Sequence, residues 1–95
     1  MAAYLVVDID VTNPAQFEEY KKLAPPAIAK YGGRYVIRGG ANETIEGNCK
    51  PQRLTIVEFE SMEKAKAFYT SPEYAVAIKA RAGAANFKAL LVQGV

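Results

Sequence analysis

The segment RLTIVEFE, residues 53–60, combines β-branched and aromatic residues in a short run, which predicts a strand. The segment RYVIRG, residues 34–39, predicts another strand shortly before it in the chain. The connection between them, residues 40–52, is polar, with a brief extended piece expected at 43–46. Two successive strands with no helix between them therefore form the middle of the expected fold.

The N-terminal part of the chain predicts a strand followed by a helix. YLVVDIDV, residues 4–11, alternates a wholly apolar set with a mixed set, which is typical of a strand. Residues 12–33 have apolar positions at helical spacing and begin with an N-cap signal at Asn13. Pro25 and Pro26 are expected to break or sharply kink this helix, because the second proline disfavours helical geometry at the first.

The C-terminal part predicts two short helices and a last strand. Ser61 can cap a helix over 62–69, and Ser71 can cap a second helix that ends near Gly83. Residues 86–94 form the last strand. The order β-α-β-β-α-β is the split βαβ pattern of an α+β, ferredoxin-like sandwich, with an antiparallel sheet and helices on one face. The 95 residues are expected to form this one domain.

Residues two apart in a strand share a face, so the pattern also predicts which side chains face the helices. Tyr35 and Ile37 are expected on the helix side. Glu58 is placed on the open face, because an unpaired carboxylate buried beneath helices would cost several kcal/mol. The open face is expected to carry these residues of the first two strands: Tyr4, Val6, Asp8, Asp10, Arg34, Val36 and Arg38.

This open face is too apolar to be left in water, which predicts a homodimer formed through the open sheet face. Asp8 and Glu58 would then pair with the arginines, because charges buried at an interface need partners. In the alternative interpretation, Arg34 and Arg38 are rim charges that protect an edge strand from aggregation. The apolar positions on which the dimer prediction rests are Val6, Val36, Leu54 and Ile56.

Composition excludes several classes of function. The net charge is +2 and the basic residues are scattered, so there is no electrostatic footprint for nucleic acid. The chain has no histidine, which excludes a Ser-His-Asp triad, a Cys-His dyad and any zinc or haem site built on imidazole. We therefore expect no cofactor, although Asp8 and Asp10 leave a weak site for a hard cation open. Cys49 is the only cysteine, so no intramolecular disulfide can form.

The N-terminus and the hydropathy of the chain give an expectation for its location. Residues 1–11 have no basic region ahead of the apolar run, so they are not expected to be a signal peptide. No apolar run approaches the roughly 18 residues of a membrane span. We expect a cytoplasmic protein without membrane contact.

Four tyrosines lie at core-facing positions of the predicted helices: Tyr20, Tyr31, Tyr69 and Tyr74. The ordinary interpretation is core packing, with each hydroxyl satisfied at an edge. Any of them could also place its hydroxyl in a ligand pocket, and Tyr31 and Tyr69 are the candidates for that role.

Several strings of the sequence resemble the family named domain of unknown function 1330. They are LAPPAIAKYGGRYVIRGG (23–40), RLTIVEFES (53–61), AKAFYTSPEY (65–74) and ARAGAA (80–85), and the resemblance covers nearly the whole chain. It implies a dimeric α/β barrel, in which two ferredoxin-like subunits pack sheet against sheet. The fold is similar to that of small cofactor-free monooxygenases, muconolactone isomerase and stress-responsive barrel proteins. No established reaction comes with the resemblance.

Two functions fit these observations. In the first, a small anionic or aromatic molecule binds in a cavity near Arg38, whose planar fork binds an oxygen of the ligand, with Arg34 as a further ligand-binding candidate. Asp8 or Glu58 would orient the ligand site or act as base in a monooxygenase- or isomerase-like reaction without metal or haem. In the second, the protein is a non-catalytic homodimeric binding or structural protein whose charged cluster fixes the dimer interface.

Overall fold

The computed structural model describes all of residues 1–95 and contains four strands and three helices. In chain order they are β1 (Ala3–Val11), α1 (Pro14–Lys30), β2 (Arg34–Arg38), β3 (Leu54–Phe59), α2 (Met62–Tyr69), α3 (Pro72–Arg81) and β4 (Ala85–Gln93). This order confirms the predicted α+β, ferredoxin-like fold. The second helical segment is divided into α2 and α3, as the two N-cap signals predicted.

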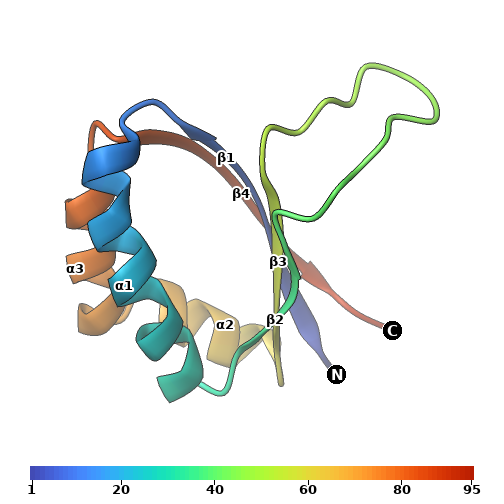
Figure 1. The fold of residues 1–95 in the computed structure, drawn as a ribbon. Coiled ribbons are helices and arrows are strands. Elements are labelled where there is room, and N and C mark those ends of the chain that lie inside the picture. The colour runs from blue at the N-terminus through green and yellow to red at the C-terminus, as the bar shows by residue number, and fades with distance from the viewer.

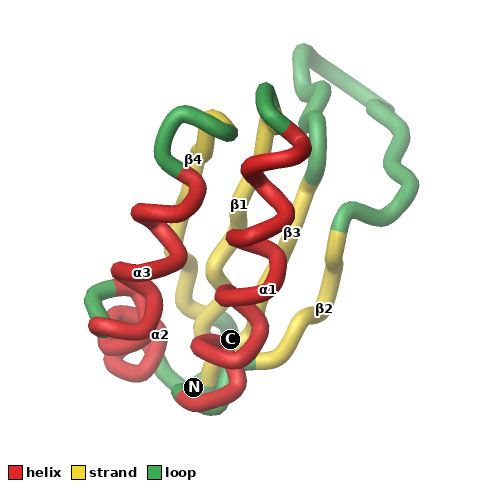
Figure 2. Tube along the Cα trace, turned by 60° about the vertical axis from the view of Figure 1, so that its left-hand side comes forward, coloured by secondary structure: helices red, strands yellow, loops and turns green.

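The strands form one antiparallel sheet in the order β2-β3-β1-β4, and all three helices lie on one of its faces (Figure 1). We call this covered side the helix face and the other side the open face. α1 lies over the middle of the sheet, α3 lies toward β4, and the edge strand β2 extends beyond α1 (Figure 2). The helices therefore leave the β2 edge of the helix face more accessible than the rest.

The alternation predicted for β1 is confirmed, and so is the face predicted for Glu58 of β3. The strand residues buried on the helix face are Ala3, Leu5, Val7, Ile9, Thr55, Val57 and Phe59. Glu58 lies on the open face, opposite Tyr4. Phe59 packs on Phe68 with ring centroids 5.2 Å apart, and burying each such ring contributes about 1.5–3 kcal/mol. A Cβ on Gly33 would lie 2.6 Å from the Phe59 ring, so the chain can pass this close only with glycine there.

β2 departs from the predicted alternation. Up to Tyr35 the strand follows a regular register against β3, and the register then shifts across Val36, which forms a bulge. Arg38 consequently pairs with Thr55, a residue buried under the helices, so Arg38 lies on the helix face. Ile37 turns to the open face. The predicted faces of Arg38 and Ile37 are therefore wrong, because a period of two does not continue across an inserted residue.

Helix α1 is also more regular than predicted. The Asn13 side chain accepts a hydrogen bond from the Gln16 amide at 3.2 Å, which confirms the N-cap. The helix then runs through Pro25 and Pro26 without interruption, so the predicted break is wrong. Burial explains the outcome, since apolar residues on both sides of the prolines pack into the same core: Phe17, Tyr20, Ala24, Ala27 and Ile28.

The long connection between β2 and β3 projects away from the rest of the molecule, on the side of the open face (Figure 1). It contains no strand, including at 43–46, where a brief extended piece was expected. Its ends are anchored, because the Gly39 amide donates to the Leu54 carbonyl at 2.8 Å and the Asp8 carboxylate accepts from the amides of Gln52 and Arg53 at 2.9 and 3.2 Å. None of the three helices combines the length and the apolarity needed to cross a bilayer.

Candidate functional site

A cavity of about 40 Å³ lies between the sheet and the helices. Its lining comes from β1, β2, β3 and all three helices, and 11 of its 15 residues are hydrophobic. No acidic residue lines it. The lining residues that carry hydroxyl or cationic groups are Tyr20, Lys21, Tyr35, Arg38, Arg53, Thr55 and Tyr74.

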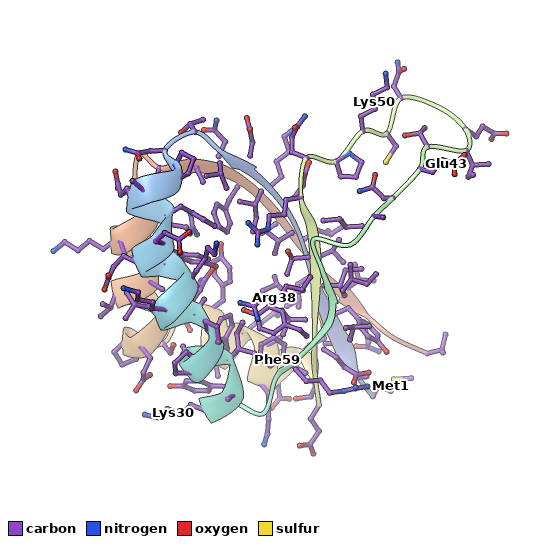
Figure 3. All side chains as sticks on the ribbon, in the orientation of Figure 1. Met1, Lys30, Arg38, Glu43, Lys50 and Phe59 are labelled. Atoms are coloured by element: carbon purple, nitrogen blue, oxygen red, sulfur yellow. The ribbon has the colours of Figure 1, made fainter.

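Arg38 reaches this cavity from the edge strand. Figure 3 shows its side chain in the space between β2 and the helices. The guanidinium carbon lies 4.3 Å from the centre of the Tyr35 ring, a cation–π distance. Arg38 makes no ion pair with any acid of the protein. The bulge at Val36 is what places this arginine here, because the bulge turns it to the helix face.

Arg53 is the second arginine of the cavity, and it was not among the site residues predicted from the sequence. It precedes β3 by one residue and shares the helix face with Thr55, two residues further on. The positive φ of Gly39, +64°, suits glycine, and a Cβ there would lie 3.2 Å from both Cγ and Nε of Arg53. Gly39 thus leaves room for the arginine stem. The period of two along β3 was the signal that could have identified Arg53.

The inner wall of the cavity contains a pair of buried phenols. The hydroxyls of Tyr20 and Tyr74 lie 2.7 Å apart. Burial raises the pKa of both residues, and burial also raises the pKa of Tyr35. All three phenols are therefore neutral near pH 7, and within the Tyr20–Tyr74 pair one hydroxyl donates to the other. The predicted core packing of Tyr20 and Tyr74 is confirmed, and both residues also line the cavity.

Neither of the two cavity arginines has a carboxylate partner. The ion pairs of the structure join Lys21 to Glu18, Lys30 to Glu73, Arg34 to Glu58 and Lys64 to Glu60. None of them includes a cavity arginine. The buried part of the lining is thus apolar, and its more accessible part carries the two arginines. This is the distribution expected of a site for an anion.

A separate polar cluster lies on the open face. Glu58 accepts hydrogen bonds from the Tyr4 hydroxyl at 2.9 Å and from Arg34 Nε at 2.6 Å. These two bonds, that from Tyr4 first, lower the pKa of the Glu58 carboxyl. Arg38 does not belong to this cluster, so the expected pairing of Arg38 with Glu58 is wrong.

Asp8 likewise lies on the open face, away from the cavity. Its Oδ1 accepts hydrogen bonds from the amides of Gln52 and Arg53, just before β3. The expected pairing of Asp8 with Arg38 is therefore wrong as well. Across the chain, no three Asp, Glu or Cys side chains converge in a way that could hold a metal ion.

The two candidate tyrosines lie outside the cavity. The Tyr31 hydroxyl donates to Glu73 at 2.9 Å, beside the Lys30–Glu73 ion pair. Tyr69 is half-buried and lines an apolar groove between α2 and β4 with Ala65 and Leu91. Of the six residues predicted for a site, only Arg38 lines the cavity, and the others are distributed over the open face and the helix ends.

Comparison with solved structures shows the same fold in several proteins at low sequence identity. A protein of unknown function from Rhodopseudomonas palustris matches with a TM-score of 0.74 and 17% identity over 99% of this chain and 82% of its own. SnoaB, a cofactor-independent oxygenase from Streptomyces nogalater, matches with a TM-score of 0.70 and 15% identity over 99% of this chain and 93% of its own. A dimeric ferredoxin-like protein of unknown function from Jannaschia sp. CCS1 matches with a TM-score of 0.71 and 10% identity over 99% of this chain and 100% of its own.

No curated protein matches the sequence. One family model matches residues 2–95, nearly the whole chain, and its description is Domain of unknown function (DUF1330). The match agrees with the resemblance of the sequence strings and with the ferredoxin-like fold. The chain therefore belongs to the DUF1330 family.

Proposed function

We propose that the protein binds a small organic anion in the cavity between the sheet and the helices. The observation that carries this proposal is that Arg38 and Arg53 both line an apolar cavity and neither has a carboxylate partner. A guanidinium fork binds carboxylate, enolate or phenolate oxygens well. The apolar lining suits the body of such a ligand, and the neutral phenols add hydrogen-bond donors.

The donor set also limits the chemistry that we propose. The cavity offers cations and hydroxyls, but no carboxylate or imidazole that could act as a base. Its residues are suited to stabilising an anion rather than to forming one. We propose that any reaction here acts on the bound anion without metal or haem, either as an isomerisation or as a monooxygenase-like reaction with O2. The fold shared with SnoaB supports the second possibility as an analogy.

Thermal unfolding with a panel of small aliphatic and aromatic acids tests the binding proposal. An acid that binds the folded protein raises the melting temperature with increasing concentration. The Arg38→Met variant, which keeps an apolar stem but has no fork, should lose this shift. Arg34→Met is the matched control, because Arg34 lies in the same strand but on the open face, and it should keep the shift. No shift of the wild type by any acid would refute the proposal.

A second proposal concerns the open face, which we propose is covered by a second copy of the chain in a homodimer. Exposed apolar side chains on this face support it, namely Val36, Ile37, Leu90 and Val92, at 48, 38, 61 and 42% exposure. The Tyr4–Glu58–Arg34 cluster would fix how the two sheets align, as in the structural alternative. A Glu58→Gln variant should then weaken the dimer in sedimentation measurements and leave anion binding unchanged.

A further inference from the structure

The charge of the cavity is not balanced by the protein. Arg38 and Arg53 bring two permanent positive charges, since a guanidinium stays protonated at every relevant pH. The remaining cation of the lining, Lys21, is already paired with Glu18 at 3.0 Å. No acid lines the cavity. Two positive charges are thus left for a ligand to neutralise.

Packing within the protein holds these two arginines in place without a counter-charge. Arg38 lies against the Tyr35 ring, and Arg53 lies against Gly39, where a Cβ would approach the arginine Cγ and Nε to 3.2 Å. Arg38 pairs in register with Thr55, and Arg53 lies two residues before Thr55 on the same face. The two guanidinium stems therefore start from neighbouring strands at the same end of the helix face.

The size of the cavity limits the part of a ligand that can be enclosed. A volume of about 40 Å³ corresponds to about three water molecules, at roughly 10–15 Å³ for each. The enclosed walls are buried apolar residues such as Val7, Ile28 and Val57, whereas Arg38 is exposed and Arg53 is half-buried. The mouth is thus cationic and the floor accepts only a short apolar group.

We infer that the natural ligand is a compact organic dianion, with two oxyanion groups at one end of a short apolar body. A dicarboxylate, or a carboxylate beside an enolate or phenolate oxygen, has this form. One oxyanion would face each arginine, and the apolar body would occupy the floor. A monocarboxylate would neutralise only one of the two guanidinium charges at the mouth. This inference rests on the proposed anion site, because it names the ligand class of that same cavity.

A matched pair of ligands tests the inference on the unmodified protein. Ethylmalonate and butyrate have the same apolar body, but ethylmalonate carries a second carboxylate, bonded to the same carbon as the first. Isothermal titration at about pH 8, where both ethylmalonate carboxyls are ionised, should show ethylmalonate binding at least about tenfold more tightly. Butyramide, the neutral analogue, should not bind detectably. Ethyl phosphate should bind less tightly than ethylmalonate, because two planar forks on different strands suit two separate planar groups.

An Arg53→Met variant tests whether Arg53 binds the second carboxylate of ethylmalonate. In Arg53→Met, the preference for ethylmalonate over butyrate should fall to within about twofold, while some binding through Arg38 remains. Arg34→Met should keep the full preference. Circular dichroism of each variant checks that the fold is retained, and the wild-type comparison stands even if a variant fails to fold.

The outcomes separate this inference from the proposal on which it rests. If butyrate binds as tightly as ethylmalonate, the anion site stands and the dianion inference is wrong. If ethyl phosphate binds more tightly than ethylmalonate, the organic dianion is the wrong ligand class. If none of these anions binds, the anion site and the dianion inference both fail.

Discussion

The buried Tyr20–Tyr74 hydroxyl pair and the Glu73 carboxylate show how single polar groups depend on partners from distant parts of the chain. Tyr20 lies in α1 and Tyr74 in α3, and their hydroxyls meet at 2.7 Å inside the core. Glu73, at the start of α3, accepts from Lys30 and Tyr31 at the end of α1. Both interactions fasten the same two helices to one another, one inside the core and one at the surface.

Removing one hydroxyl of the tyrosine pair should cost more than half of the free energy of unfolding that is lost when both hydroxyls are removed. Tyr20→Phe leaves the Tyr74 hydroxyl buried without its partner, which we expect to lower the free energy of unfolding by about 1–3 kcal/mol. The double variant with Tyr74→Phe should cost less than the sum of the two single changes. Urea unfolding of the four proteins measures this. Tyr69→Phe is the control, because the Tyr69 hydroxyl has no hydrogen-bond partner in the protein, and strict additivity would contradict the prediction.

Glu73 should make stability depend on pH in the acid range. Its hydrogen bonds, that from Lys30 first, lower the pKa of the carboxyl from 4.5 to about 2. Because the folded-state pKa is the lower one, this stabilisation is present above about pH 4.5 and is lost as the pH falls toward 2. Glu73→Gln should therefore lower the melting temperature at pH 7 and reduce its dependence on pH in that window.

Glu63→Gln is the matched control for this prediction. Glu63 occupies the same position in the first turn of α2 that Glu73 occupies in α3, but it makes no ion pair. Glu63→Gln should have only a small effect on how the melting temperature depends on pH in the acid range. Equal effects of the two substitutions would show that the helix N-terminus, rather than the contact with Lys30, lowers the pKa.

Two elements of the fold, β2 and α1, depart from their local sequence signals. In β2, one additional residue at Val36 changes which face carries Arg38. In α1, two consecutive prolines lie within a continuous helix. Each departure affects the cavity, since Arg38 lines it from β2, and Ala24 and Ile28 line it from either side of the prolines in α1.

The prolines of α1 should make the helix less stable than its packing allows. Pro26 is exposed and lacks the amide hydrogen that would reach the Lys22 carbonyl one turn earlier. Pro26→Ala should raise the free energy of unfolding by about 1–2 kcal/mol, because a gain of up to about 3 from helix propensity is reduced by the freer unfolded chain. Chemical denaturation measures the change. Pro14→Ala, at the first position of the same helix, should not stabilise, since no helical bond is missing there.

The whole molecule presents one face to its helices and leaves the other with an apolar band. Along this band Leu90 of β4 pairs with Val6 of β1, which pairs in turn with Ile56 of β3. The loop between β2 and β3 projects on the same side (Figure 1). A homodimer through the open face would cover this band and leave the cavity on the helix face of each subunit free to bind a ligand.

A single charge in the apolar band should disrupt this homodimer. Leu90→Lys places an ammonium where a second sheet would pack, and it should yield monomers at micromolar concentration because the buried charge has no partner. Light scattering coupled to size exclusion measures the mass. Val76→Lys is the control, because Val76 on α3 is similarly exposed, at 57% against 61% for Leu90, but lies in the helix layer. A wild type that is monomeric, or a Leu90→Lys variant that stays dimeric, would contradict the homodimer.

The order of the elements, their caps and the faces of β1 and β3 could be predicted from the sequence. These features depend on residues close together in the chain: the alternation from Leu5 to Ile9, and the caps at Asn13, Ser61 and Ser71. Glu58 was placed correctly by the cost of burying a charge, which needs no knowledge of its partners. Local period and local hydrogen bonding were sufficient for this part of the fold.

The composition of the cavity was decided only by tertiary structure. Whether Val36 forms a bulge depends on how β2 pairs with β3, so no local pattern could place Arg38 on the helix face. The continuity of α1 depends on the core that its apolar residues enter on both sides of the prolines. Arg53 and the Tyr20–Tyr74 pair come together only when the helices pack on the sheet. Contacts between residues distant in the chain therefore formed the site, because their packing outweighed local conformational preference.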